Sequence, residues 1–296
     1  MHRSYNNIED ISLVDADSRV YENMGKTCTG NMAVDTMVRI FKESVKWRDL
    51  IIALALKELK QRYKQRYLRA AWAAVNPLFT MVIFVFIFSR VAGFSSEGVP
   101  YPVFNFVALV PWSFFAGCLV LSCNSLISNY NLITRLRFPR ITIPISSVMA
   151  NLLDFAITIF ILAVMFAMYH ISIGISAIYL IPVFLIQLLF TFGMAFILSI
   201  SNAYLRDIQS SLTVIIQAWM LISPVAYSLD MIGEKYRFFY LLNPMAGILD
   251  SYRKILIHNT APDFYCISIS FFVSLAVFVL GYWFFKKLER DLADII

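Results

Sequence analysis

Few residues in this sequence have the types and spacing that catalysis or metal binding requires. His2, His170 and His258 are scattered along the chain, and the four cysteines form no C-x-x-C pair. Enzymes need a nucleophile beside a base, paired acids or a cluster of metal ligands. Gly25-Lys26-Thr27 resembles the end of a phosphate-binding loop, but Val20 stands where that motif needs its first glycine. We therefore expect no catalysis, no bound metal and no ATP hydrolysis by this chain.

The long apolar stretches contain one acid, Asp154, and two glutamines, Gln187 and Gln217. An ionisable side chain inside a membrane is costly, so its presence suggests a function. Asp154 could contact a substrate, but it could equally be neutral or paired with an arginine near a cytoplasmic helix end. With no base or second acid beside it in the sequence, it indicates a conduit more than a catalyst.

The composition predicts an integral membrane protein. Hydrophobic residues make up 59% of the 296 residues, charged residues make up 15%, and the mean hydropathy is +0.70. A soluble domain carries about 25% charged residues, so part of the apolar surface must face lipid. The net charge of +6 comes from basic residues beside the apolar stretches. Positive-inside topology accounts for them, and we do not expect nucleic-acid binding.

The apolar stretches predict an all-α membrane protein with six transmembrane helices, in a domain that covers residues 70–290. We place these helices at residues 70–88, 103–123, 143–169, 178–200, 212–229 and 266–285. Basic residues fall near positions 135–140, at 206 and after 285, which puts these regions and both termini in the cytoplasm. Residues 1–40 are then a polar cytoplasmic tail, and residues 291–296 are a cytoplasmic C-terminus.

Residues 41–69 are predicted to contain an amphipathic helix that lies at the membrane interface. Ile52, Leu56 and Leu59 recur at helical spacing on one face, although Ile51 and Leu54 make the stripe imperfect. A basic helix with an apolar face suits an anionic bilayer surface. Its basic residues are Lys57, Lys60, Arg62, Lys64, Arg66 and Arg69.

Two connecting segments do not have the composition of simple loops. Residues 129–140 are basic and apolar, and we expect a short helix that continues to Pro139 and docks on a cytoplasmic partner; interfacial anchoring is the alternative. Its candidate contact residues are Asn131, Leu132, Arg135, Leu136, Arg137, Phe138, Pro139 and Arg140. Residues 231–260 contain an apolar run too short to cross a membrane, broken by Asn243-Pro244. We expect interfacial or re-entrant helices on the outer side there, although an amphipathic loop is also compatible.

Aromatic residues reach 16% of the chain, with 26 Phe, 15 Tyr and 5 Trp. Interfacial belts and helix packing account for many of them. Aromatic rings also bind the C–H faces of sugars, so an aromatic-lined passage would suit a sliding glycan. The residues that we expect to line such a passage are Phe79, Phe84, Phe88, Trp112, Phe115, Trp219 and Tyr227.

Taken together, the order of short motifs resembles the membrane subunit of a type-2 ABC exporter of the polysaccharide branch, which includes O-antigen, capsule and teichoic-acid permeases. The resemblance covers most of the chain after Trp47. Arg69 is a departure, because the family usually has glycine there. The motifs are Trp47-Arg48-Asp49-Leu50, residues 57–64, Leu68 with Trp72 and Pro77, Tyr101-Pro102, residues 111–115, Leu132-Ile133, Phe138-Pro139, Arg206-Asp207, residues 224–227 and Asn243-Pro244.

The resemblance implies a homodimeric permease of the bacterial cytoplasmic (inner) membrane that works with two copies of a separate ATPase subunit. The ATPase would hold ATP and magnesium, and this chain would bind no cofactor. Residues 129–140 would be the coupling helix, with a second ATPase contact at Arg206 and Asp207, and residues 231–260 would form outer re-entrant gate helices. The substrate would be a polysaccharide linked to undecaprenyl diphosphate, whose diphosphate the basic interface helix could attract.

Three alternatives remain open from the sequence. An exporter of drugs or small hydrophobic solutes needs no aromatic passage and should tolerate Phe-to-Leu changes in the first span. A membrane-embedded transferase acting on a lipid carrier predicts an acid-rich metal motif. A scaffold or channel predicts no ATPase partner.

Overall fold

The computed structural model describes residues 46–63, 68–91, 93, 98–136, 138–289 and 292, and all regular secondary structure in these ranges is helical. The predicted N-terminal tail, Lys64, Arg66 and Arg137 lie outside the described residues. An all-α fold is therefore confirmed for the part of the chain that can be described.

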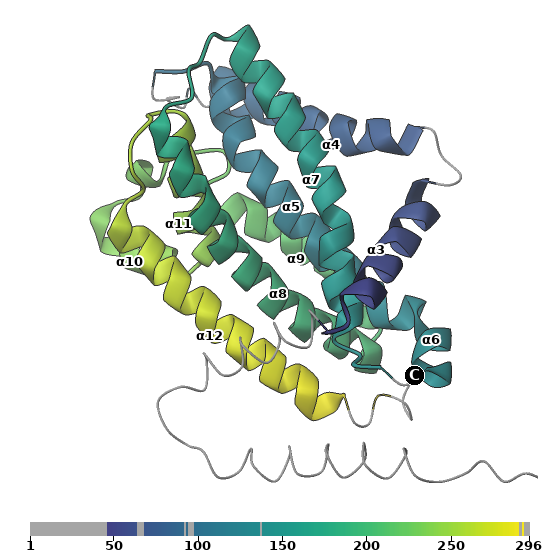
Figure 1. The fold of residues 1–296 in the computed structure, drawn as a ribbon. Helices are drawn as coiled ribbons and strands as arrows, with labels where there is room; N and C mark the ends of the chain where they lie inside the picture. Colours follow the sequence, from purple (N-terminus) through teal and green to yellow (C-terminus); the bar gives the residue numbers. More distant parts are fainter. Residues whose placement is uncertain are drawn as a thin grey trace, which may run out of the picture. The chain divides into compact units, whose positions relative to one another are not determined.

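Among the described residues, four helices are long and apolar enough to cross a membrane. They are α5 (Tyr101–Ser128), α7 (Thr142–Met168), α8 (Leu180–Tyr204), which extends the short 3-10 helix Ile175–Tyr179, and α12 (Phe264–Leu288). In Figure 1 they run as neighbouring rods, and α5 packs against both α7 and α8, while α8 packs against α12. These four agree with predicted spans to within a few residues because each is an uninterrupted apolar run.

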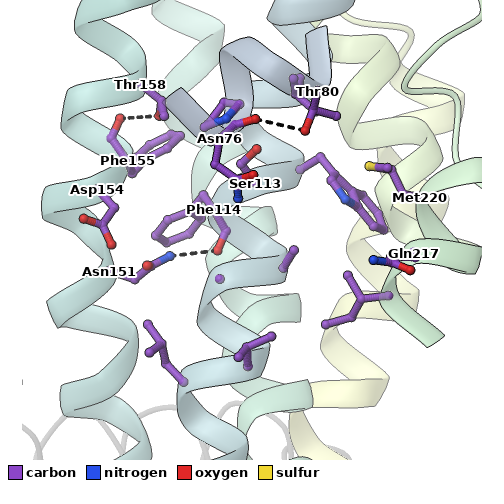
Figure 2. Close-up of a pocket in the computed structure, with 18 of the residues that line it drawn as sticks. Asn76, Thr80, Ser113, Phe114, Asn151, Asp154, Phe155, Thr158, Gln217 and Met220 are labelled. Carbon is purple, nitrogen blue, oxygen red and sulfur yellow. Dashed lines mark hydrogen bonds between the residues drawn. The ribbon is translucent and has the colours of Figure 1, made fainter. Parts of the chain in front are cut away.

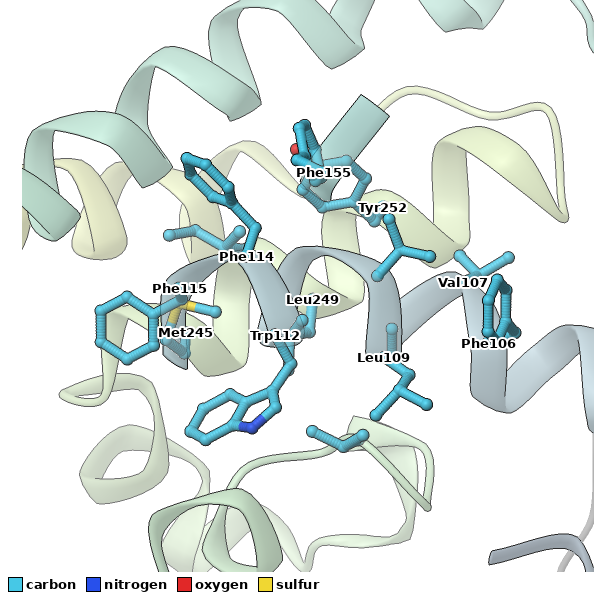
Figure 3. Packing of buried hydrophobic residues seen from close by; sticks show 14 of the residues in the cluster. Phe106, Val107, Leu109, Trp112, Phe114, Phe115, Phe155, Met245, Leu249 and Tyr252 are labelled. Carbon is cyan, nitrogen blue, oxygen red and sulfur yellow. The ribbon is translucent and has the colours of Figure 1, made fainter. Parts of the chain in front are cut away.

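Helix α5 is the centre of the core. Most of its residues between Tyr101 and Leu126 are buried, and it contacts α4, α7, α8, α9 and α11. Figure 3 shows Trp112 and Phe115 of α5 close to Met245 and Leu249 of α11, within one cluster of buried hydrophobic residues. A helix that is apolar all round belongs in such a central position, because no face of it needs water.

Two shorter apolar helices correspond to the predicted first and fifth spans. Helix α4 (Leu68–Phe84) continues as a π-helix over Val85–Val91, so this helical segment is longer than the predicted 70–88. Helix α9 (Asp207–Ile222) begins before the predicted residue 212 and ends before the predicted residue 229. It stops at Ser223, whose extended backbone is the conformation favoured before a proline, here Pro224.

The segment after α9 folds into short helices. A 3-10 turn at Leu229–Met231 is followed by α10 (Glu234–Leu241) and α11 (Pro244–Leu256). Asn243 caps α11 by accepting a hydrogen bond from the Met245 backbone N–H at 3.2 Å, and Pro244 occupies the first helical position. The Asn-Pro pair is therefore a helix start signal. Helix α11 is almost wholly buried against α5, α8 and α12.

Small residues allow α8 and α12 to approach closely. A Cβ added to Gly193 would lie 2.7 Å from the backbone nitrogen of Phe278, and one added to Gly281 would lie 2.4 Å from the carbonyl oxygen of Gly193. Backbones that come this near gain van der Waals contact, which is the main attraction between helices in lipid.

Candidate functional site

Helix α3 (Arg48–Tyr63) packs against α7 on the side of Ile51 and Leu54, and the stripe predicted to lie on the bilayer does not take part in this contact. Ile51, Leu54 and Ala55 are buried, whereas Ile52 and Leu56 are 53% and 49% exposed. The predicted apolar stripe, with Ile52 and Leu56, is therefore not covered by other parts of the protein. Ile51 and Leu54, which lie outside that stripe, form the face that packs against α7.

Polar contacts fix this arrangement between α3 and α7. Arg62 donates from Nη2 to Glu58 Oε1 at 2.9 Å and from Nη1 to Asp154 Oδ2 at 3.3 Å. Ser147 of α7 donates to the other Glu58 oxygen at 2.9 Å. The Arg62 side chain is only 10% exposed and the Asp154 side chain 30% exposed. Asp154 is therefore paired with an arginine, which was one of the alternatives that its sequence position allowed.

Two of the basic residues predicted to form a surface on α3 make contacts within the protein instead. Lys57 donates to Asn129 Oδ1 at 2.9 Å, and Arg62 is held by the two carboxylates, whereas Lys60 is exposed. Of the basic residues of α3 that were expected to attract a diphosphate, Lys60 alone is exposed in the part of the helix that the structure describes. Arg69 lies in the first turn of α4.

A cavity of about 560 Å³ lies beside this ion pair, between α4, α5, α7 and α9. Figure 2 shows Asn151, Asp154 and Thr158 on one wall and Gln217 and Met220 on the opposite wall, with Ser113 and Phe114 between them. Arg62 and Trp112 also line it. The cavity thus brings together two of the three polar residues singled out in the apolar stretches, Asp154 and Gln217.

The third, Gln187, has a structural role. It donates to the carbonyl oxygen of Pro111 at 2.7 Å and accepts a hydrogen bond from the Tyr252 hydroxyl at 3.0 Å. Both partners are buried, so this glutamine joins α5, α8 and α11 and faces no passage.

The predicted coupling segment contains a short helix, α6 (Tyr130–Arg135), which ends earlier than predicted. Leu136 is extended, and its N–H closes the last turn on the Leu132 oxygen at 3.0 Å. Helical backbone is disfavoured at Phe138 because Pro139 follows it. Ile133 points into the protein, while Asn131, Arg135 and Leu136 are exposed, as are Arg206 and Asp207 at the start of α9.

Arg140 makes internal contacts that the sequence did not reveal. Its backbone N–H donates to Glu289 Oε1 at 3.0 Å, and its guanidinium donates to the Glu289 carbonyl oxygen. Glu289 in turn pairs with Lys286 at 2.9 Å. Arg140 therefore ties the segment after α6 to the end of α12, where a cation stabilises the exposed carbonyls of a helix C-terminus.

The candidate aromatic residues do not form one continuous wall. Trp112, Phe115 and Trp219 form a cluster with Phe190, and the rings of Phe115 and Trp219 meet edge-on with centroids 5.3 Å apart. Trp112 and Phe115 are 2% and 0% exposed, and Figure 3 shows both side chains in the cluster of buried residues. Their packing is that of a helix core, and of these residues Trp112 borders the cavity.

The remaining aromatic candidates lie elsewhere. Phe79 is 63% exposed on α4, and Phe84 meets Phe88 edge-on at 5.4 Å. Tyr227 contacts Tyr240 through its hydroxyl and donates to the Ile222 carbonyl oxygen at 2.8 Å. Burial raises the pKa of Tyr227 above its ordinary value, against the lowering effects of Tyr240 and Arg253, so its hydroxyl stays neutral.

Arg253 of α11 is a structural centre that the sequence did not reveal. It is 3% exposed, and its guanidinium donates to the carbonyl oxygens of Val225 and Tyr227, both at 2.6 Å. It also stacks 3.9 Å from the centre of the Phe104 ring. Tyr101 and Asn105 of α5 hold the same loop through the oxygens of Ala226 and Val225. The motif at residues 224–227 thus forms turns and bends, and the carbonyl oxygens of Val225, Ala226 and Tyr227 accept hydrogen bonds from side chains of α5 and α11.

Comparison with known proteins places these features in a family. A model described as ABC-2 type transporter matches residues 49–257. A Klebsiella pneumoniae protein named O-antigen export system permease protein RfbA is 34% identical over 249 residues, which are 84% of this chain and 95% of that protein. A second RfbA from the same species is 32% identical over the same shares. The Myxococcus xanthus protein of that name is 32% identical over 77% of this chain and 87% of its own length.

Proposed function

This chain belongs to the ABC-2 type transporter family as a membrane permease subunit, and we propose that it exports O antigen or a similar polysaccharide linked to undecaprenyl diphosphate. It is a multi-pass protein of the bacterial inner membrane and a transporter component rather than an enzyme. The observation that carries the proposal is the identity of 32–34% with O-antigen export permeases over most of both chains.

The proposed topology has six spans with both termini in the cytoplasm. The four long apolar helices account for four spans, and the apolar helices Val75–Val91 and Asp207–Ile222 would supply the other two. Helices α10 and α11 then lie on the outer side as gate elements, with the loop at residues 224–227 packed beneath them. The burial of α11 and the hold of Arg253 on this loop support a defined outer structure.

Coupling to ATP hydrolysis is proposed to run through α6. Two permease copies would pair with two copies of a cytoplasmic ATPase that binds ATP and magnesium, and the exposed Leu136, Arg135 and Asn131 would enter a groove on it. Arg206 and Asp207 are exposed and would form the second contact. Support comes from the exposed Arg135 at the end of α6 and the exposed Leu136 directly after it, because a solvated loop has no need of an exposed leucine.

The function is tested by complementation. The chain, expressed with its ATPase in a strain whose own O-antigen permease gene is deleted, should restore polysaccharide at the cell surface. The matched control is the same pair of proteins with an ATPase that cannot hydrolyse ATP, which should leave lipid-linked glycan inside the cell. Restored resistance to small hydrophobic drugs without surface polysaccharide would overturn the proposal in favour of a drug exporter.

A further inference from the structure

One face of α7 presents polar groups to the cavity between α4, α5, α7 and α9. Asn151, Asp154 and Thr158 are spaced by three and four residues, which places them on the same side of a helix. Asn151 is oriented by its hydrogen bond to the Phe114 oxygen at 3.0 Å, and Asp154 is oriented by Arg62. This wall is therefore held in place by contacts within the protein, and its polar groups face the cavity.

The facing helices contribute polar side chains that have no protein partner. Asn76 of α4, Ser113 of α5 and Gln217 of α9 line the same cavity, and none of these side chains makes a hydrogen bond with another residue that the structure describes. Nε of Arg62, nine-tenths buried, also lacks a partner among the described residues. Asn76 and Gln217 are exposed and Ser113 is half-buried, so these three groups are open to a ligand that enters the cavity, whereas the buried Nε of Arg62 is a polar atom that costs free energy while it makes no hydrogen bond.

The charged groups at the cavity indicate which kind of ligand it can bind. Among the described residues that line the cavity, Arg62 is the one cation, and it already contacts two carboxylates, Asp154 of the lining and Glu58 beside it. These described groups therefore leave no positive charge in excess for a phosphate or diphosphate. Amide, hydroxyl and carboxylate groups instead suit a neutral molecule rich in hydroxyls.

Aromatic rings and size point in the same direction. Trp112, Phe114 and Phe155 line the cavity among its polar groups, so the C–H face of a sugar ring can pack on aromatic carbon while its hydroxyls bind amides. The volume of about 560 Å³ lies within the roughly 300–1,000 Å³ of small-molecule sites. Such a space accommodates one or two sugar rings and not a folded polymer.

We propose that this cavity is a saccharide-binding subsite within each protomer, an inference that rests on the proposed export of a glycan. Asn76, Ser113 and Gln217 bind hydroxyls from three helices, and Asp154, positioned by Arg62, binds them from α7. The subsite holds a short stretch of the chain during export, apart from the contact of the carrier diphosphate.

Photo-crosslinking tests the contact directly. The complete exporter, with p-benzoylphenylalanine in place of Gln217, is irradiated in membranes of cells whose glycan carries a radioactive sugar. The matched control replaces Ala218, which is exposed at the same depth of α9 but is turned about 100° away and does not line the cavity. Labelled glycan should attach at position 217 at least tenfold more than at position 218.

Several outcomes of that experiment would overturn the subsite. They are equal labelling at both positions, no labelling at position 217 while export continues, and a crosslink to a second copy of this chain. An adduct of the carrier lipid at position 217, detected by its mass in cells that make the carrier lipid but no glycan, would do the same, because the cavity would then hold lipid.

Removal of the amides provides a second test that does not depend on the bulky label. The double variant Asn76→Leu with Gln217→Leu should reduce glycan export at least tenfold, while assembly with the ATPase and thermal stability stay unchanged. Ala218→Leu is the control for added apolar bulk and should export normally. Full export by the double variant would refute the subsite and leave the proposed function intact, whereas failure of the unaltered chain to export glycan would refute the function itself.

Discussion

Replacement of Arg253 by methionine should be among the most damaging single changes in this protein. The guanidinium is buried and donates two hydrogen bonds of 2.6 Å, to the carbonyl oxygens of Val225 and Tyr227. Methionine fills a similar space and can still contact the Phe104 ring, but it donates nothing. Two buried carbonyl oxygens would lose their charged donor, and the loop at residues 224–227 would lose its hold on α11.

The size of the effect follows from the number and type of these bonds. A hydrogen bond to a charged group contributes about 1.5–3 kcal/mol, so two of them give about 3–6 kcal/mol of lost unfolding free energy. Water that enters from the outer side would favour the lower end of that range. Tyr101→Phe removes one neutral bond, to the Ala226 oxygen at 2.6 Å, and should cost about 1 kcal/mol.

The measurement is reversible unfolding of the purified permease in mixed micelles with increasing SDS. Arg48→Met is the control for loss of an arginine, because that side chain is 73% exposed and its pair with Asp49 is expected to contribute almost nothing. Arg253→Lys keeps the charge without the planar fork and should remain destabilised. A loss below about 1 kcal/mol for Arg253→Met would refute the reasoning that these hydrogen bonds hold the loop.

Three further predictions concern other parts of the fold. Gly193→Ala should cost about 1–3 kcal/mol in the same assay, because its Cβ would force α8 and α12 apart, whereas Gly233→Ala meets open space and should be neutral; equal stability of both would contradict the close packing. Phe138→Asp or Arg137→Glu should abolish export and ATPase binding while membrane insertion, followed by fractionation, stays normal; unaltered export with normal co-purification would count against the coupling role. Burial opposes ionisation of Asp263, but hydrogen bonds from Cys266 and Tyr265 and the Lys254 ammonium together hold its pKa below the usual value. Its stabilising effect should be complete above the ordinary carboxyl pKa and be lost as the pH falls through the lowered one; an SDS titration at acidic pH should show a smaller loss for Asp263→Asn than for the unaltered chain, and parallel losses would refute the assignment.

The long helices could be predicted from the sequence because their signal is local. Helix α5 was expected at residues 103–123 and occupies Tyr101–Ser128, since an apolar run of that length has few other ways to satisfy its backbone. Pro224 likewise marked the interruption after α9. The end of α6 was less predictable: Pro139 set an outer limit, but Leu136 becomes extended three residues earlier.

Side chains that hydrogen-bond to the backbone of distant segments could not be predicted in this way. Arg253 follows a short apolar run, and a charge in that position is usually read as a flank that faces water. Its partners are carbonyl oxygens of Val225 and Tyr227, and carbonyls carry no sequence signature. Arg140 was missed for the same reason, because it caps α12 at Glu289. A buried arginine is recognised only once the donors and acceptors of a segment are counted in three dimensions.

The orientation of α3 shows how tertiary contacts decide between two local possibilities. The helix carries two apolar stripes, one with Ile51 and Leu54 and one with Ile52 and Leu56, and periodicity cannot choose between them. The choice is made by Glu58 and Arg62, which lie on the side of the first stripe and meet Ser147 and Asp154 on α7. The two stripes differ little in the apolar area that they could bury. The Glu58–Arg62 pair decides the orientation, because these charges would be far more costly if they faced lipid. The second stripe is then left exposed beside Lys60, and this is the surface through which the helix would meet the bilayer.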